Sequence, residues 1–431
     1  MGATITEKIL ARASGRDRVA PGENVWIDVD VLLTHDVCGP GTIGVFQREF
    51  GKDARVWDRE KVVIIPDHYI FTQDEKCRRN VDTLRAFADE QGLPHVYPPD
   101  TPRYRGVCHV ALPQEGHVRP GEVIVGTDSH TCTHGALGAM ATGIGNTDAG
   151  FVMGTGKLLV KVPPSLRFVI NGKLPAHVCA KDIILRIIGD IGVDGANYCA
   201  MEFTGDTIAA LDIEERMTIC NMAIEAGGKN GIIAPDDKTL DYVRARTEQP
   251  FDPLFSDPGA AYRETREYDA ADLEACVAAP HLPSNYQAAA AADVTLDRAY
   301  IGSCTGGKLT DFIMAAEVLK GRRVAIETFL VPATTEVAEG LITETIDGTS
   351  LVEIFAAAGC RDVAPPSCAA CLGGPVDTIG RTHGDEVVIS TTNRNFVGRM
   401  GSKSARIYLA SPRTVAASAV TGRITDPREF I

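Results

Sequence analysis

Short apolar runs that end in acidic or histidine residues recur through the first third of the chain. Four of them are typical of buried strands: residues 25–33, 61–66, 105–110 and 122–126. The polar groups at or just beyond their ends are Thr34-His35-Asp36, Asp67-His68, Cys108-His109 and Asp128-Ser129-His130. Because open α/β sheets build their sites at strand ends, this pattern predicts a functional site there.

Helical and strand patterns alternate through the rest of the chain. Helices are expected at residues 4–14, 80–91, 180–191 and 217–227, and further strands at 166–170, 298–301 and 387–390. Residues 245–292 contain proline, charged and alanine-rich stretches without a sustained strand pattern, so we expect a linker there. The alternation predicts an α/β protein, long enough for two or three lobes.

Three cysteines lie in two glycine-rich loops. Cys368 and Cys371 belong to Pro-Ser-Cys-Ala-Ala-Cys-Leu-Gly-Gly, and Cys304 belongs to Ile-Gly-Ser-Cys-Thr-Gly-Gly. Three thiolates without a fourth fit a cubane iron–sulfur cluster with one open iron, because electron-transfer clusters usually have four cysteine ligands. An open iron can polarise a substrate C–O bond as a Lewis acid.

Other interpretations of the paired cysteines remain open at this point. A lone Cys-x-x-Cys also suits a structural zinc site, a redox pair or two buried small residues, and these readings together outweigh the cluster if the pair is taken alone. A structural zinc needs four ligands, and the nearest candidates, Cys360 and His383, fall outside the usual spacing. The redox reading lacks the expected βαβ context.

Carboxylates adjoin imidazoles in Asp67-His68 and in Asp128-Ser129-His130. Such pairs fix the histidine tautomer and raise its basicity, as a proton shuttle to a leaving hydroxyl requires, and His109 could join them. Each histidine taken alone is more often a satisfied core residue or a helix cap.

Two further pairs could bind polar groups. Asn221 and Glu225 are four positions apart and share one face of the expected helix. Arg394 and Arg399 flank a glycine-containing loop and could clamp carboxylates with two hydrogen bonds each. The alternative for the arginines is a solvated surface, which the intervening Asn395 disfavours.

Composition restricts the classes of function. The 431 residues include 42 glycines and only 6% aromatic residues, as expected of an α/β enzyme with many tight loops. A net charge of −14 argues against a duplex-binding surface, so no nucleic-acid partner is expected. Twelve scattered cysteines without a signal peptide favour a cytoplasmic location, and no apolar run is long enough to predict a membrane partner.

Taken together, the motifs resemble those of the aconitase superfamily, and within it the separate large subunits of 3-isopropylmalate dehydratase. The resemblance covers nearly the whole chain and rests on five segments in the family's order: GTDSHTCTHGALGAMATGIGNTD, TICNMAIEAG, IGSCTGG, PSCAACLGG and NRNFVGR. It implies a three-lobed α/β/α large subunit without the swivelling fourth domain, with lobes at residues 1–164, 165–285 and 286–431.

The resemblance also implies the roles of individual residues. Cys304, Cys368 and Cys371 would bind a [4Fe-4S] cluster whose fourth iron binds substrate. Asp67 with His68 would pass a proton to the leaving hydroxyl. The remaining catalytic positions are His109, Asp128, His130 and Glu225, and the substrate-binding positions are His35, Ser129, Asn221, Asn393, Arg394 and Arg399.

The implied activity is that of a hydro-lyase acting on a malate-like hydroxy dicarboxylate, with 2- and 3-isopropylmalate in leucine biosynthesis as the expected substrates. Homoaconitase and 2,3-dimethylmalate dehydratase are alternatives, and an iron sensor that binds RNA is an alternative from another class. In the family a fourth domain contributes the serine base, and this chain stops at Ile431, so a small subunit is the expected partner. Two positions depart from the family: His35 replaces the glutamine of aconitases, and Gly306 replaces an asparagine.

Overall fold

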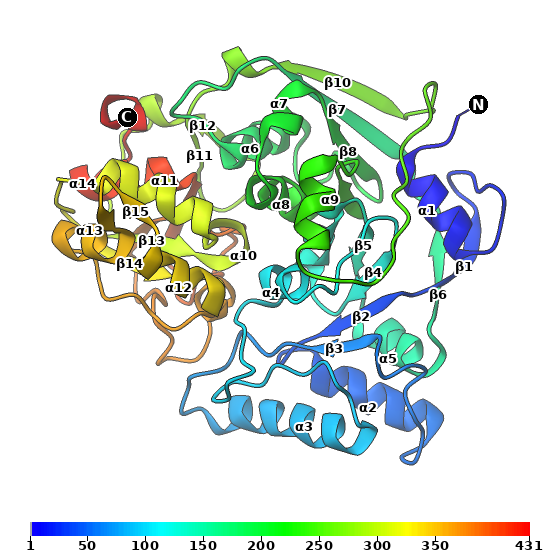
Figure 1. Ribbon diagram of the computed structural model, residues 1–431. Coiled ribbons are helices and arrows are strands. Elements are labelled where there is room, and N and C mark those ends of the chain that lie inside the picture. Colours follow the sequence, from blue (N-terminus) through cyan, green and yellow to red (C-terminus); the bar gives the residue numbers. More distant parts are fainter. Residues whose placement is uncertain (1) are drawn as a thin grey trace. The chain divides into compact units, whose positions relative to one another are not determined.

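The computed structural model describes residues 2–431, which form two compact units. Unit 1 contains residues up to Tyr104, Ala111–Asn171 and Ala196–Tyr268, and unit 2 contains Arg105–Val110, Gly172–Gly195 and Asp269–Ile431. Figure 1 traces the elements of both units along the chain. Strands and helices mix in each unit, as the α/β prediction requires.

A four-stranded parallel sheet in unit 1 carries the polar strand ends. Its strand order is β3-β2-β4-β5, with bounds Val62–Ile64, Val31–Thr34, Val123–Gly126 and Met140–Gly143. Helices α2 (Gly39–Phe50), α3 (Glu75–Gln91) and α5 (Asn146–Thr155) pack together beside it (Figure 1). Strands β2, β3 and β4 are buried along their whole length, which explains their continuous apolar runs.

Two more sheets complete unit 1. One has the order β10-β7-β8-β9, with bounds Glu264–Asp269, Ser165–Asn171, Ala200–Thr204 and Asn230–Ile232. The other pairs β1 (Asn24–Asp28) with β6 (Lys157–Lys161) in antiparallel orientation. The remaining helices are α1 (Ile5–Ala13), η1 (Ser129–Leu137), α7 (Asp206–Ala210), α8 (Ile213–Asn221), η2 (Met222–Ala226) and α9 (Asp237–Arg244). Helix α4 (Cys108–Gln114) begins in unit 2 and ends in unit 1.

Unit 2 is built on a six-stranded mixed sheet. Its order is β12-β11-β18-β17-β13-β14, with bounds Tyr286–Ala288, Cys276–Ala278, Arg406–Ala410, Val387–Ser390, Arg298–Gly302 and Glu327–Val331. A short hairpin pairs β15 (Thr345–Ile346) with β16 (Thr349–Ser350). The helices are α6 (Ala180–Ile191), α10 (Ser303–Gly306), α11 (Leu309–Leu319), α12 (Thr335–Thr343), α13 (Leu351–Ala358) and α14 (Pro412–Thr421), with short 3₁₀ turns η3 (Ala270–Asp272), η4 (Ala289–Ala291), η5 (Ala369–Leu372) and η6 (Pro427–Phe430).

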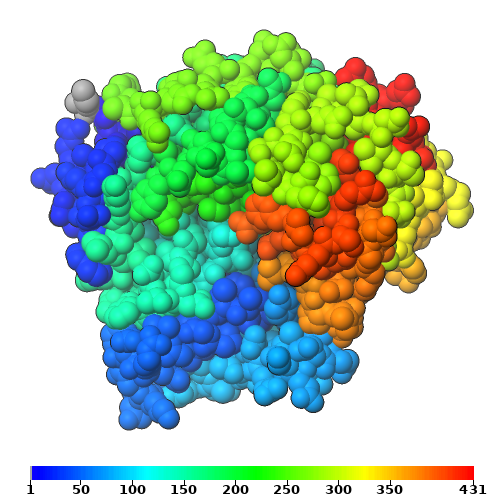
Figure 2. Space-filling view, turned by 180° about the vertical axis from the view of Figure 1, so that it is seen from behind, coloured from blue at the N-terminus to red at the C-terminus, as the bar shows by residue number. Residues whose placement is uncertain are grey.

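The long segment between α13 and β17 reaches the surface of unit 2. It is coloured orange in Figure 2, and its side chains Val376 and Ile379 are exposed. The same segment carries Cys368 and Cys371, which are buried.

The structure corrects four expectations about elements. The run 25–33 is two strands, β1 and β2, which belong to different sheets. Residues 105–110 do not form a strand: Gly106 makes a single bridge to Thr334, and α4 begins at Cys108. The expected helix 217–227 is divided between α8 and the 3₁₀ helix η2. The expected linker contains β10, β11 and β12.

The division into three lobes stays a prediction. The proposed boundary at residue 285 falls between β11 and β12, which pair with each other in the sheet of unit 2. In the described part of the chain, no helix is both long enough and apolar enough to cross a bilayer.

Candidate active site

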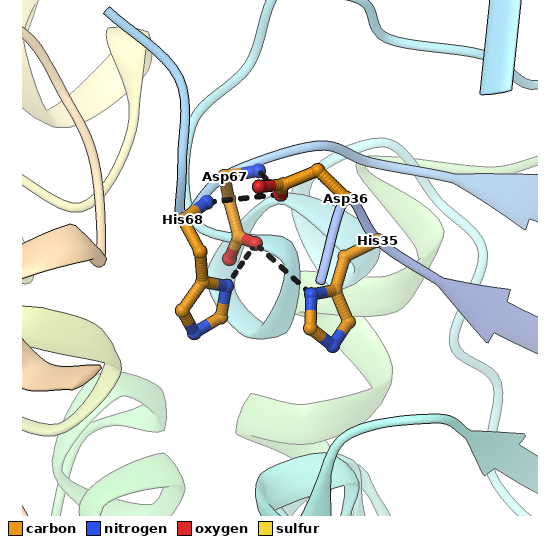
Figure 3. Close-up of side chains that lie close together, drawn as sticks. All are labelled: His35, Asp36, Asp67 and His68. Carbon is orange, nitrogen blue, oxygen red and sulfur yellow. Dashed lines mark hydrogen bonds and ion pairs between the residues drawn. The ribbon is translucent and has the colours of Figure 1, made fainter. Parts of the chain in front are cut away.

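Asp36 joins the ends of two neighbouring strands in unit 1. It follows β2, and its Oδ1 accepts hydrogen bonds from the backbone amides of Asp67 (2.8 Å) and His68 (3.1 Å) beyond β3. Its Oδ2 accepts a third bond from the Tyr69 amide at 2.6 Å. Figure 3 shows how the Asp36 carboxylate lies against this turn. Asp36 therefore fixes the position of the Asp67–His68 pair, a role that the sequence analysis did not assign.

Asp67 lies between two histidine rings. Its Oδ1 is 2.6 Å from His68 Nδ1 and 3.9 Å from His35 Nδ1, and both rings point toward it in Figure 3. The ring centroids of the two histidines are 4.8 Å apart. All three residues are buried. Because the strands are parallel neighbours, their polar ends meet at one edge of the sheet.

The two histidines differ in the direction in which their surroundings shift the pKa. Burial lowers the pKa of His68, but the charge and hydrogen bond of Asp67, with the charges of Asp36 and Asp128, outweigh it and raise this pKa to about 10. Burial and the neighbouring His68 lower the pKa of His35 despite the same carboxylates. At neutral pH His68 is therefore the protonated ring and His35 the neutral one.

The same four side chains could in principle hold a metal ion. One ligand atom from each of His35, Asp36, Asp67 and His68 lies within 4.8 Å of the others. However, both oxygens of Asp36 already accept backbone hydrogen bonds, and His68 bonds Asp67 directly. The arrangement is therefore better suited to holding and releasing a proton.

A third histidine of unit 1, His130, lies between two carboxylates. Asp128 caps η1 by accepting the His130 amide at 2.8 Å, and its Oδ1 is 3.3 Å from His130 Nδ1. The other ring nitrogen lies 2.8 Å from Glu225 Oε1. Asp128 Oδ2 is also 3.8 Å from His35 Nε2, so the network is continuous with the Asp67 group.

Asn221 and Ser129 have different surroundings. Asn221 is fully buried, and its amide donates to Thr133 Oγ1 at 2.8 Å, which in turn donates to the His130 carbonyl at 2.6 Å. Asn221 thus supports the helix that carries His130. Ser129 is half-buried at the start of η1.

The three predicted cluster cysteines meet inside unit 2. Cys304 follows β13 in α10, while Cys368 and Cys371 lie at and within η5. All are 2–4% exposed. Hydrogen bonds from the Cys368 thiol to Cys304 and Cys371, together with burial, raise the pKa of Cys368 well above its usual value. Cys368 therefore lies within hydrogen-bond range of the other two thiols.

Asn393 bridges two of these thiols. It follows β17, the strand beside β13, and is fully buried. Its Nδ2 donates to Cys304 Sγ at 3.3 Å, and its Oδ1 accepts from Cys371 Sγ at 3.1 Å. Three buried thiols with an amide between them suit an iron–sulfur cluster held by three thiolates.

Gly306 and Thr391 fit each other beside the cysteines. A side chain at Gly306 would place its Cβ 2.2 Å from that of Thr391. The Thr391 hydroxyl bonds the amide and carbonyl of Gly302 and the carbonyl of Gly306. Thr391 therefore takes the space that an asparagine would need at position 306 and ties the two loops together.

Tyr300 is a neighbour of the cysteines that the sequence analysis missed. Its side chain is buried, and its hydroxyl has no hydrogen-bond partner within residues 2–431. Burial raises its pKa well above the usual value, and the nearby Cys368 and Cys371 act in the same direction. Its position on β13 gave no signal, because a tyrosine in a buried strand is ordinary.

His109 is buried near the start of α4, beside the segment that anchors the Cys304 loop. The Val107 amide donates to the Ala333 carbonyl at 2.7 Å, and the Ala333 amide donates to the Gly307 carbonyl at 2.7 Å. Backbone contacts thus tie residues 105–110 to the loop that follows Cys304.

The two predicted carboxylate-binding arginines lie in the loop after Asn393. Both are half-buried. The Nε of Arg399 is buried and has no hydrogen-bond partner within the described chain. Five other arginines share this feature, so it does not by itself mark an anion site, although a carboxylate bound at this loop could accept a hydrogen bond from Arg399.

The alternative zinc ligands do not join the cysteines. Cys360 packs against the hydrophobic core of unit 2, and burial raises its pKa to about 12. His383 is exposed. Neither residue is among the groups that raise the pKa of Cys368.

Comparison with known proteins gives a consistent family. The model of the aconitase family (aconitate hydratase) matches residues 7–290 and 284–422. The 3-isopropylmalate dehydratase large subunit, chloroplastic, of Arabidopsis thaliana is 57% identical over 443 residues, covering 100% of this chain and 87% of that protein.

Two further relatives match over almost their whole length. The probable 3-isopropylmalate dehydratase large subunit of Methanothermobacter thermautotrophicus is 49% identical over 430 residues, covering 99% of each chain. The 3-isopropylmalate dehydratase large subunit 1 of Methanopyrus kandleri is 44% identical over 434 residues, covering 100% of each. The resemblance expected from the motifs is confirmed: the chain belongs to the aconitase family.

Proposed function

We propose that this chain is the cluster-bearing large subunit of a 3-isopropylmalate dehydratase. It interconverts 2-isopropylmalate and 3-isopropylmalate by dehydration and rehydration in leucine biosynthesis. The observation that carries the proposal is the meeting of three buried cysteines in a chain 44–57% identical, over its full length, to proteins named for that activity.

Cys304, Cys368 and Cys371 would hold a [4Fe-4S] cluster with one iron left without a protein ligand. Family membership supports an iron–sulfur cofactor, and the buried thiols beside Asn393 support these three ligands. When bound, the cluster supplies a Lewis acid for the substrate hydroxyl and carboxylate.

His68 delivers the proton that leaves with the hydroxyl group. Its raised pKa keeps it protonated at neutral pH, and the short bond to Asp67 orients the ring. Removing a hydroxyl as water instead of hydroxide lowers the barrier, which is the contribution of a general acid.

The remaining predicted residues bind and orient. Arg394, Arg399 and Asn393 hold the carboxylates of the substrate. His130, between Asp128 and Glu225, and His109 orient water. His35, Ser129 and Asn221 are the remaining residues expected to bind substrate.

A small subunit is the partner in this proposal, because the relatives that match over their whole length are named large subunits. A cytoplasmic location is also part of the proposal, although the Arabidopsis relative is named as chloroplastic.

The test is a substrate comparison with the cluster reconstituted anaerobically and a small subunit of this enzyme class added. Absorbance of the unsaturated diacid intermediate would be followed with 3-isopropylmalate, homoisocitrate and 2,3-dimethylmalate. We expect the highest kcat/KM with 3-isopropylmalate. A higher value with either competitor would assign the chain to that reaction, and no activity with all three would overturn the proposal.

A further inference from the structure

A lysine is buried in unit 2 where no activity requires it. Lys181 is the second residue of α6 and is 2% exposed. Its Nζ donates to the carbonyl oxygens of Thr391 at 3.0 Å and Thr392 at 2.7 Å. Lysine is almost never fully buried unless it is paired, because desolvating its charge is costly.

The two carbonyls that Lys181 holds come directly before Asn393. The amide of Asn393 lies between Cys304 Sγ and Cys371 Sγ, donating to one and accepting from the other. A chain of contacts therefore runs from the ammonium group through the turn to two cysteine sulfurs. Loss of the first contact would remove one restraint on the turn that positions the last one, while the bonds of Thr391 to Gly302 and Gly306 would remain.

The charge of Lys181 is not neutralised by a partner of its own. Its contacts in the described chain are the two carbonyls, and no carboxylate forms an ion pair with it. The neighbouring buried cation, Lys308, is paired with Asp311 at 2.7 Å.

The electrostatic environment connects Lys181 to the same sulfurs. Burial lowers its pKa to about 8, and Lys308 acts in the same direction. Asp311, Cys304 and Cys371 oppose this, so the thiols are near enough to interact with the ammonium charge. Thiolates attract a cation much more strongly than thiols do, especially in an interior of low dielectric constant.

We propose that Lys181 is a positioning residue of the cluster site, which fixes the Thr391–Asn393 turn and offsets the negative charge of the cysteine thiolates. This inference rests on the proposed function, because it needs the cluster that the three cysteines would hold. Lys181 itself does not touch substrate in this role. Outer partners of metal ligands commonly change metal affinity about 10- to 100-fold when removed.

The experiment compares wild type with Lys181→Met and Lys181→Gln after anaerobic reconstitution. Methionine removes the charge and both hydrogen bonds, whereas glutamine removes the charge and can keep one bond. Lys320→Met is the control for loss of a lysine, because Lys320 donates to the Ile346 carbonyl, pairs with Asp347 and carries no predicted role at the cysteines. Circular dichroism and the Tm of the cluster-free proteins establish that each variant folds. If Lys181→Met does not fold, the comparison is made with Lys181→Gln alone.

Two measurements decide the outcome. Both Lys181 variants should lose cluster absorbance to a chelator about 10-fold or more faster than wild type and Lys320→Met. Their cluster reduction potential, measured by titration with spectroscopic detection, should be more negative, because a nearby cation stabilises the reduced cluster. An unchanged potential with only a lowered Tm would overturn the inference, since that pattern belongs to a purely structural lysine. Failure of wild type to form any cluster would instead overturn the proposed function, and the inference with it.

Discussion

At the scale of single residues, one carboxylate makes two similar histidines different. Asp67 is 2.6 Å from His68 but 3.9 Å from His35, so it stabilises the imidazolium of the first ring much more strongly. Two cations 4.8 Å apart would repel, and only one ring is protonated at neutral pH. His68 is therefore the ring that can donate a proton at neutral pH, as the proposed function requires.

Replacing His68 by alanine should lower turnover with little change in substrate binding. A proton given to a departing hydroxyl acts in the transition state, and removal of a general acid typically costs about 10²- to 10⁴-fold in rate. Steady-state kinetics of the reconstituted enzyme with its small subunit would measure kcat and KM separately. A large rise in KM with kcat preserved would mean that His68 binds substrate instead.

Alkaline pH should destabilise the chain through the same residue. The folded pKa of His68 is about 10, above the ordinary value of 6.5, so its proton stabilises the fold fully below pH 6.5. That stabilisation is lost as the pH rises from there through 10. Between pH 7 and 9.5 the free energy of unfolding of cluster-free wild type should fall by about 1–3 kcal/mol more than that of His68→Gln.

Urea denaturation of both proteins at the two pH values would measure this difference. Other groups that titrate at alkaline pH change the free energy of unfolding of both proteins equally, so their effects cancel in the difference. Equal losses in wild type and variant would show that the His68 pKa is not raised.

At the scale of elements, the site was predictable where parallel strands end and less so elsewhere. β2, β3 and β4 were recognisable as apolar runs, and their parallel pairing brings His35, Asp67 and Asp128 together. The strand expected before His109 was wrong, because a short apolar stretch also suits the helix α4. β10 was missed because it is a polar strand at a sheet edge, with alternating exposed and half-buried positions.

The roles of Asp36 and Lys181 could not be predicted from sequence patterns, because they depend on contacts with distant parts of the chain. The part played by Asp36 depends on backbone amides more than 30 positions away, and that of Lys181 on carbonyls more than 200 positions away. Neither residue has a local pattern that distinguishes it from an ordinary helix cap or surface lysine. Motif resemblance, by contrast, identified the three cysteines that the fold brings together.

Serine substitutions should distinguish the three cysteines that bind the cluster from the other cysteines of the chain. Serine at Cys304, Cys368 or Cys371 should abolish the brown colour of the reconstituted chain, because serine is a poor iron ligand in place of a thiolate. Cys360→Ser should keep it, since Cys360 packs into the core. Absorbance and iron content would check this. Stoichiometric zinc in a colourless protein would contradict the ligand assignment.

The Gly306 turn should tolerate no side chain. Alanine there would meet Thr391, which holds both loops, and overpacking of this kind costs about 1–3 kcal/mol. Gly306→Ala should therefore lower the Tm of the cluster-free protein. Gly44→Ala in α2 is the control: nothing lies within 4 Å of its added Cβ, and alanine favours the helix. If both variants had wild-type stability, Thr391 would not be the constraint.

At the scale of the whole molecule, the chain should be inactive alone and active with a small subunit. Removing a proton from carbon beside a carboxylate needs a strong base, and in the proposed function the small subunit supplies it. The carboxylates of the site are already engaged, Asp67 with His68 and Glu225 with His130. A separate subunit that supplies the base would also exclude water when it closes over the site.

The reconstituted chain would be assayed with and without such a partner, and His68→Ala with the partner would be the control for contaminating activity. Full dehydratase activity from the purified chain alone would contradict this, because it would mean that a residue of this chain supplies the base.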